Sequence, residues 1–223
     1  MTETPRFTLF AFWRTSATYR VRVAMNLKDL VAAERQVNLI EGQQHDPAFL
    51  KLNPMAAIPA LLDHAAGAPD TALTQSLAIL EFLEEVAPAP ALLPSDPHGR
   101  ARVRSLSLLL AADTHPFITP RVRKRLAQMP GFDDAAWKDW QTHWITTGLQ
   151  GLERRLAEPG TGVFCHGDTP GMADICLASI IVVMRVFKIE VAGIPTVERI
   201  MAACETLPAF AQADPMRQVG APA

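Results

Sequence analysis

A proline- and alanine-rich stretch at residues 88–97 separates two parts of the chain that have different sequence patterns. Proline lacks a backbone N–H and fixes its own φ angle, so closely spaced prolines interrupt helices and are excluded from central strands. The stretch is typical of an extended linker between domains. We expect residues 1–87 to form one domain and residues 98–223 to form another. The prolines concerned are Pro88, Pro90, Pro94 and Pro97.

Strand and helix patterns alternate in the part before the linker. An apolar run at residues 7–12 predicts a strand, residues 16–29 predict a helix, and residues 31–39 predict a second strand. This β-α-β order implies two parallel strands joined by a right-handed crossover. The remaining expected elements are a helical turn at 46–50, strands at 58–63 and 71–73, and an amphipathic helix that begins at Gln75 and Ser76. Together they predict an α/β domain.

Only helical patterns follow the linker, so we expect an all-α second domain. Its most apolar run, residues 175–186, is too short to span a bilayer and predicts a helix buried in the core. Tryptophans at spacings of three and four indicate a packing stripe rather than a ligand site. The expected helices span residues 100–113, 121–129, 135–156, 172–187 and 196–205, with a Pro/Ala tail after them, and the stripe is Trp137, Trp140 and Trp144.

Charge and cysteine content narrow the function classes. The net charge of −2 gives no electrostatic basis for a nucleic-acid or membrane partner. The three cysteines have no CxxC spacing, which favours a reducing, cytoplasmic compartment over a disulfide framework. Acid and proline precede any apolar run at the N-terminus, so we expect no signal peptide. Cys165, His166 and Asp168 share one short loop without a second cluster, so we expect no metal site.

Two adjacent residues with hydroxyl side chains lie between the first predicted strand and the first predicted helix. Thr15 and Ser16 are positioned at the helix N-terminus, where unpaired N–H groups and the helix dipole favour an anion. A simple N-cap is the alternative interpretation. Arg14, Arg20 and Arg22 lie in the same stretch and favour a functional role.

These segments, taken in order, resemble the glutathione transferase superfamily, and within it the zeta class. Residues 14–24 resemble the zeta signature Arg-Ser-Ser-Cys-x-x-Arg-Val-Arg-Ile-Ala. The resemblance covers essentially the whole chain and implies a thioredoxin-like N-terminal domain followed by a helical C-terminal domain. Further matching segments are Asn38-Leu39-Ile40, Leu52-Asn53-Pro54-Met55, Ile58-Pro59, Gln75-Ser76-Leu77-Ala78-Ile79, Leu92-Leu93-Pro94 and Gly167-Asp168-x-x-x-Met172-Ala173-Asp174.

Three positions depart from the family pattern. Thr15 replaces the first serine of the signature, which keeps the hydroxyl but adds a stiff β-branch. Ala17 replaces the signature cysteine, so any contribution of that thiol is absent. Gly171 stands where the superfamily usually has a serine or threonine cap, and glycine caps a helix nearly as well as threonine.

The resemblance implies glutathione as the cofactor and assigns a role to each candidate residue. It places Thr15 first and Ser16 second as the hydroxyl that stabilises the glutathione thiolate. It implies that the backbone of Ile58, ahead of a cis-Pro59, binds the cysteinyl part, and that Gln75 and Ser76 hold the γ-glutamyl carboxylate, with Gln44 as a further contact. Candidate substrate contacts are Arg14, Arg20, His115, Arg121 and Arg185. Arg14 and Arg20 are candidates because they lie nearby in sequence, and each could equally be a surface or ion-pair residue. Arg121 lies in a basic run that is usually a solvated face, and a charge at Arg185 in so apolar a helix needs a partner or a cavity.

The implied activity is glutathione-dependent cis–trans isomerisation of an α,β-unsaturated diketo acid, of the maleylacetoacetate or maleylpyruvate type, by reversible thiolate addition. One alternative is a general glutathione transferase that conjugates small electrophiles or acts on haloacids. A second is a glutathione-binding or interaction protein without turnover, which the changes at Thr15 and Ala17 keep open. The resemblance also implies a small carboxylate substrate and a homodimer.

Overall fold

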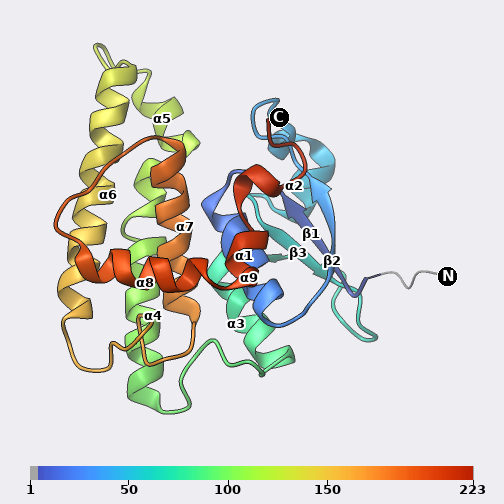
Figure 1. Cartoon of the computed structure of the whole chain (residues 1–223). Coiled ribbons are helices and arrows are strands. Elements are labelled where there is room, and N and C mark those ends of the chain that lie inside the picture. The colour runs from blue at the N-terminus through green and yellow to red at the C-terminus, as the bar shows by residue number, and fades with distance from the viewer. Residues whose placement is uncertain (1–4, 223) are drawn as a thin grey trace. The chain divides into compact units, whose positions relative to one another are not determined.

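The computed structural model describes residues 5–222, and within them the chain divides into two compact units. One unit runs to Ala91 and includes the chain again from Pro208, and the other is Leu92–Leu207 (Figure 1). The first unit contains a thioredoxin-like sheet and the second is helical, which confirms the predicted fold class. The division differs from the expected one at the C-terminal end, where the last segment groups with the first unit.

The sheet of the first unit has the strand order β2-β1-β3-β4. Strand β1 pairs with β2 in parallel, as the predicted crossover requires, and with β3 antiparallel, while β4 pairs antiparallel with β3. The second strand is shorter than expected, because the backbone turns where the Asn38 side chain accepts a hydrogen bond from the Ile40 N–H at 3.0 Å. The strands are β1 (Phe7–Ala11), β2 (Ala32–Gln36), β3 (Ala60–Asp63) and β4 (Leu73–Thr74).

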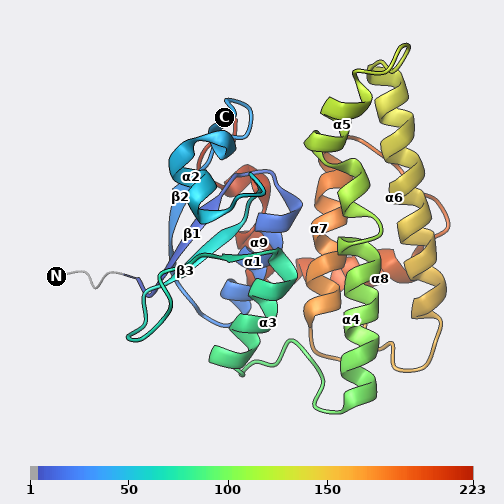
Figure 2. The ribbon, with the colours of Figure 1, turned by 180° about the vertical axis from the view of Figure 1, so that it is seen from behind.

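Helices cover both faces of this sheet. Side chains alternate between faces along a strand, so Phe7 and Phe10 of β1 point to opposite sides. The Phe7 ring contacts Phe82 of α3 (Ser76–Val86) with 6.4 Å between centroids, and the Phe10 ring contacts Phe49 of α2 (Pro47–Leu52) at 6.0 Å. Helix α1 (Ser16–Leu27) packs against α3, and both appear beside the strands in Figure 2. A 3-10 turn, η1 (Gln43–His45), precedes α2.

A buried lysine ties the end of α1 to the end of α3. The Lys28 ammonium lies 2.8 Å from a Glu84 carboxylate oxygen, and it donates to the carbonyls of Ala87 at 2.6 Å and Pro90 at 2.9 Å. A buried charge is tolerated when it is paired and hydrogen-bonded in this way. The contacts hold the first residues of the proline-rich segment against the first unit.

The C-terminal segment, for which the sequence pattern predicts only a Pro/Ala tail, contains ordered structure. It forms α9 (Pro208–Gln212) and a 3-10 turn, η3 (Pro215–Arg217). Helix α9 packs on α1, where the Asn26 side chain donates to the Ala209 carbonyl at 2.9 Å. Ala221 then packs against an apolar cluster that includes Trp13. The segment therefore completes the first unit.

The second unit contains the predicted helices with small changes at their ends. Its most apolar helix, α7, is buried from Met172 to Val183, and none of the helices among residues 5–222 is long and apolar enough to cross a membrane. The tryptophan stripe is a packing feature, as expected: Trp144 stacks on Phe117 at 4.1 Å, and Trp140 donates to the Phe117 carbonyl. The elements are α4 (Pro97–Ala111), η2 (His115–Ile118), α5 (Pro120–Leu126), α6 (Asp134–Leu156), α7 (Met172–Val186) and α8 (Pro195–Glu205).

Asp174 organises the start of α7. One carboxylate oxygen accepts from the Gly171 N–H at 2.9 Å, and the other accepts from the Cys165 N–H at 2.8 Å. The side chain is 1 % exposed. Burial raises the pKa of the Asp174 carboxyl above its ordinary value, against the two backbone hydrogen bonds, which act in the opposite direction. Asp174 therefore has a structural, capping role at the start of α7.

The structure explains why a glycine stands at position 171. A Cβ atom added to Gly171 would lie 2.8 Å from the Leu92 carbonyl oxygen, which accepts a hydrogen bond from the Met172 N–H at 2.9 Å. Backbone cannot retreat from such a contact as the end of a flexible side chain can. The usual hydroxyl cap is therefore excluded by the close approach of the segment at Leu92.

Gly171→Ala should destabilise the protein by about 1–3 kcal/mol, because the added methyl group overpacks against backbone. Gly151→Ala is the matched control: its Cβ would meet Leu109 at 3.8 Å, an ordinary contact, in the interior of α6. That change should leave stability unchanged or raise it by up to about 1 kcal/mol through helix propensity. Urea unfolding of the two variants measures both effects, and equal midpoints for Gly171→Ala and the unmodified protein would contradict the steric explanation.

Candidate active site

Strand register brings four segments to one end of the sheet. Phe10 pairs with Ala60, and Ala60 pairs with Thr74, while Ala11 at the end of β1 pairs with Gln36 at the end of β2. The residues after β1, after β2, before β3 and after β4 therefore meet at this end. These segments carry nine of the predicted site residues: Arg14, Thr15, Ser16, Arg20, Gln44, Ile58, Pro59, Gln75 and Ser76.

Thr15 is the N-cap residue of α1, but its hydroxyl does not cap the helix. The Thr15 Oγ1 lies 2.7 Å from the Thr18 Oγ1 and 3.3 Å from the Phe12 carbonyl oxygen. No acidic residue lies in the first turn of α1. The first-turn N–H groups and the positive end of the helix dipole are therefore left without a capping side chain at this end of the sheet.

Ser16 is the first residue of α1 and its side chain is enclosed. The residue is 2 % exposed, and among residues 5–222 its hydroxyl has no hydrogen-bond partner. Thr15 is half-buried by contrast. Of the two candidate hydroxyls, Thr15 is the one accessible from outside the protein.

The start of α3 is linked to α1 through a buried arginine. The Arg20 guanidinium, 2 % exposed, donates to the Ser76 hydroxyl at 2.8 Å. The structure therefore places Arg20 beneath the helix starts, in contact with a predicted cofactor-binding residue. Gln75, which precedes Ser76, is exposed and has a φ of +67°. A positive φ is unfavourable for a residue with a Cβ, and such strain is commonly retained at binding sites.

The other two segments contribute backbone and an amide. The Ile58–Pro59 peptide bond is cis, as predicted, and Ile58 packs in one apolar cluster with Phe12 and Trp13. Gln44 lies in η1, and its side-chain oxygen is buried with no hydrogen-bond partner among the described residues. A buried amide oxygen without a partner is an acceptor available to a ligand N–H.

Arginines also shape the loop that leads into α1. Arg14 is exposed, and its guanidinium lies over the Trp13 ring, 5.4 Å from the centroid. Arg22 is buried and forms a two-point ion pair with Glu34 of β2, at 2.7 and 2.8 Å, and it also donates to the Trp13 carbonyl at 3.3 Å. Arg22 thus fixes the loop that ends at Thr15, and the sequence pattern gave it no specific role.

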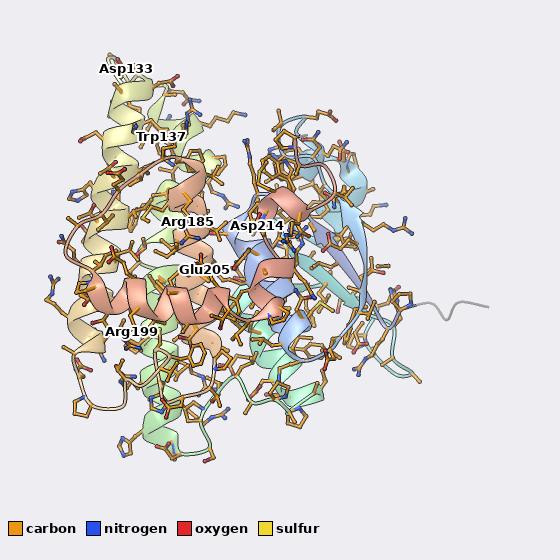
Figure 3. All side chains as sticks on the ribbon, viewed as in Figure 1. Asp133, Trp137, Arg185, Arg199, Glu205 and Asp214 are labelled. Carbon is orange, nitrogen blue, oxygen red and sulfur yellow. The ribbon has the colours of Figure 1, made fainter. Side chains whose placement is uncertain are left out.

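The remaining predicted residues lie in the helical unit. His115 begins η2 and is half-buried, and Arg121 is exposed on α5, next to an ion pair between Arg123 and Asp134 at 2.7 Å. Arg185 is exposed near the end of α7 and forms an ion pair with Glu205 of α8 (Figure 3). The partner that a charge in so apolar a helix requires is therefore Glu205.

The protein's own thiols are enclosed in the structure. All three cysteines are free and buried. Burial raises the pKa of the Cys165 and Cys204 thiols well above the ordinary value. Among residues 5–222 there is also no group of three or more His, Cys, Asp or Glu side chains arranged to hold a metal ion. Thiolate chemistry at this site therefore requires a thiol from outside the chain.

Known proteins resemble this chain in sequence and in fold. Residues 5–85 match the family model of the glutathione S-transferase N-terminal domain. A structure of maleyl pyruvate isomerase, described as a bacterial glutathione S-transferase in the zeta class, superposes with a TM-score of 0.90 at 38 % identity, covering 96 % of this chain and 100 % of that one. The chain belongs to the zeta class of the glutathione transferase superfamily.

Relatives of this zeta-class chain match over nearly their full length. The "probable maleylacetoacetate isomerase" of Vibrio cholerae is 40 % identical over 94 % of this chain and 96 % of its own, and the maleylpyruvate isomerase of a Ralstonia species is 38 % identical over 94 % and 97 %. The maleylacetoacetate isomerase of Methylobacterium extorquens, solved with bound malonate and glutathione, superposes with a TM-score of 0.92 at 45 % identity, covering 97 % of this chain and all of that one.

Two helix starts of this zeta-class chain have the chemistry that the thiolate and one carboxylate of glutathione require. Two helix N-termini, those of α1 and α3, start from segments at one end of the sheet, and each is suited to an anion. The start of α1 offers a hydroxyl to a thiolate, and the start of α3 offers Ser76 and backbone N–H groups to a carboxylate. The unpaired Gln44 oxygen provides an acceptor for the peptide.

Proposed function

We propose that this protein is a glutathione-dependent cis–trans isomerase that acts on an α,β-unsaturated diketo acid of the maleylacetoacetate or maleylpyruvate type. The observation that carries the proposal is the Thr15 hydroxyl at the uncapped N-terminus of α1. Glutathione, when bound, would supply a thiolate that adds to the substrate double bond, so that rotation about the resulting single bond and loss of glutathione give the trans product. The names of the relatives and the glutathione in the Methylobacterium structure support this choice.

Thr15 keeps the glutathione thiol ionised. A thiol with an ordinary pKa near 8.5 is largely protonated at neutral pH and a poor nucleophile. A hydroxyl donor together with the helix N-terminus stabilises the thiolate and lowers the thiol pKa by roughly one to two. Ser16 contributes to the shape of the helix start, because its hydroxyl is enclosed.

The other residues of the first unit bind and orient glutathione. Ser76 and Gln75 hold the γ-glutamyl carboxylate at the start of α3, and the Ile58 backbone ahead of cis-Pro59 meets the cysteinyl part. Gln44 contributes a further contact. Arg20 positions Ser76 through their 2.8 Å hydrogen bond, in addition to its positive charge near the helix starts.

Cationic side chains bind the substrate. The substrate carries carboxylate and enolate charge, so transition-state stabilisation requires positive charge or hydrogen-bond donors. Arg14 is the exposed cation on the loop that leads to Thr15. His115, Arg121 and Arg185 are the candidates from the helical unit, and the ion pair of Arg185 with Glu205 makes it the weakest of the three.

A glutathione transferase that conjugates electrophiles or acts on haloacids is the second candidate, because it would use the same thiolate. The basic residues proposed for carboxylate binding favour isomerisation over conjugation. A protein that binds glutathione without turnover is disfavoured, because Thr15 retains the hydroxyl despite the change from serine. We further propose a cytoplasmic location, which the three free cysteines support, and a homodimer, which the resemblance to the family implies.

An ultraviolet assay of maleylacetoacetate and maleylpyruvate isomerisation, with and without glutathione, tests the proposal. We expect turnover that requires glutathione and leaves its concentration unchanged. Loss of glutathione in step with product would identify the conjugating transferase instead. The non-catalytic alternative predicts a third result. The protein would bind glutathione but would not turn over either acid, a haloacid, or an electrophile such as a chlorinated nitrobenzene.

A further inference from the structure

A second hydroxyl lies directly behind Thr15. The Thr18 Oγ1 is 2.7 Å from the Thr15 Oγ1, the distance of a well-formed hydrogen bond between two hydroxyl groups. Thr18 is 0 % exposed, so its hydroxyl cannot exchange this contact for water. Among the described residues, Thr15 is the hydrogen-bond partner found for the Thr18 hydroxyl. The pair is therefore closed on the Thr18 side and accessible on the Thr15 side.

Counting protons indicates how the pair responds to an anion. Each hydroxyl has one proton to donate and two lone pairs that accept. When Thr15 turns its proton toward a thiolate, it can no longer donate to Thr18, but its oxygen remains an acceptor. The Thr15 oxygen can then accept the Thr18 proton at the same 2.7 Å contact. This produces a chain in which Thr18 donates to Thr15 and Thr15 donates to sulfur.

Such a chain strengthens the terminal hydrogen bond. A hydroxyl that accepts a hydrogen bond becomes a better donor, by about 10–30 % per bond. The contact also limits the rotation of the Thr15 side chain, because only some staggered rotamers place its oxygen 2.7 Å from that of Thr18. Thr18 follows Thr15 by three residues in the first turn of α1, so the helix itself sets this geometry.

We propose that Thr18 is a positioning residue for the thiolate-binding hydroxyl: it orients Thr15 and increases its strength as a hydrogen-bond donor to the bound glutathione sulfur. The proposal rests on the proposed function, in which Thr15 is that donor. It adds a residue that does not touch the ligand and that the resemblance to the zeta class does not assign.

The test measures the pKa of bound glutathione from the ultraviolet absorbance of its thiolate as a function of pH. Thr18→Val keeps the shape and the β-branch and removes the hydroxyl, so the pKa of the bound thiol should rise by roughly 0.5. Thr18→Ser, which keeps the hydroxyl, should retain the pKa of the unmodified protein. Thr8→Val is the matched control. It removes a threonine hydroxyl of the same unit, one that contacts the His64 ring at 2.9 Å and not Thr15.

The outcomes separate this proposal from the proposed function. An unchanged or lowered thiol pKa in Thr18→Val would overturn the role of Thr18, and a lowered value would mean that Thr18 competes for the Thr15 proton. Failure of the unmodified protein to isomerise either acid would overturn the function and leave the pKa comparison intact. In a Thr15→Val background, Thr18→Val should produce no further rise, and Thr18→Ala provides a second variant in case the valine variant folds poorly.

Discussion

Thr15→Val should lower glutathione-dependent turnover on the order of 100-fold, because removing a preorganised donor to a developing or resident anion has an effect of this size. The substitution keeps the β-branch and the volume, so the start of α1 remains packed while the hydroxyl next to Thr18 is lost. The pKa of the bound thiol should rise by roughly one, since the helix N-terminus still contributes. Steady-state kinetics and thiolate absorbance measure the two effects.

Two companion variants make this result specific. Thr15→Ser restores the residue found in the zeta signature and should keep turnover within about threefold of the unmodified protein, because the hydroxyl is the group that acts. Ser16→Ala should have a much smaller effect than Thr15→Val and should not reduce stability, because it removes a buried hydroxyl that has no partner among the described residues. A larger loss for Ser16→Ala than for Thr15→Val would assign the donor role to Ser16 instead.

Asp174→Asn should lower the free energy of unfolding by about 2–4 kcal/mol at pH 7, because it leaves a buried backbone N–H facing the amide NH₂. Both carboxylate oxygens of Asp174 are in use, one at the Gly171 N–H and one at the Cys165 N–H. An amide has one acceptor oxygen, so one of these bonds must be lost. Asp168→Asn is the control, since that exposed carboxylate accepts a hydrogen bond from the Val163 N–H at 3.0 Å through a single oxygen.

The pH dependence of this difference has a defined sign. Burial raises the pKa of Asp174 in the folded protein, so the folded state binds a proton more readily than the unfolded state. This contribution to stability is complete below the unfolded pKa of 3.8 and is lost as pH rises through the folded pKa. Asparagine has no such titration. The stability gap between the unmodified protein and Asp174→Asn should therefore widen as pH falls from 7 toward 4, and a narrowing gap in urea unfolding would contradict this.

The order of elements in the first unit follows from local patterns. Alternation in residues 7–12, amphipathic spacing after Ser76 and the proline at the start of the third strand are all short-range signals, and the structure confirms the elements they predict. The C-terminal elements are different. Helix α9 has five residues, too few for a helical period to be read, and its position depends on Asn26, which is far away in sequence. Its docking on α1 was therefore not predictable from local pattern.

The candidate site divides in the same way. The positions of Thr15, Ser16 and Ser76 at helix starts follow from sequence, because hydroxyl residues before amphipathic runs mark N-termini. The link from Arg20 to Ser76 joins residues on two helices and depends on how those helices pack, so sequence indicated only a positive charge near the site. The positive φ of Gln75 is likewise a property of the folded backbone. Thr18 could have been found from the sequence, because it follows the N-cap residue by three positions, the spacing at which capping-box side chains meet.

The return of the chain from Pro208 to the first unit has a consequence for how the protein is made. During translation the segments for the whole sheet leave the ribosome before the helical unit, but the face of α1 near Asn26 stays uncovered until the segment from Pro208 emerges. Of the two units, the thioredoxin-like one therefore begins to be synthesised first and is completed after the other. A premature stop codon after residue 207 would leave every sheet strand and site residue in place, but the face of α1 that α9 covers would be exposed.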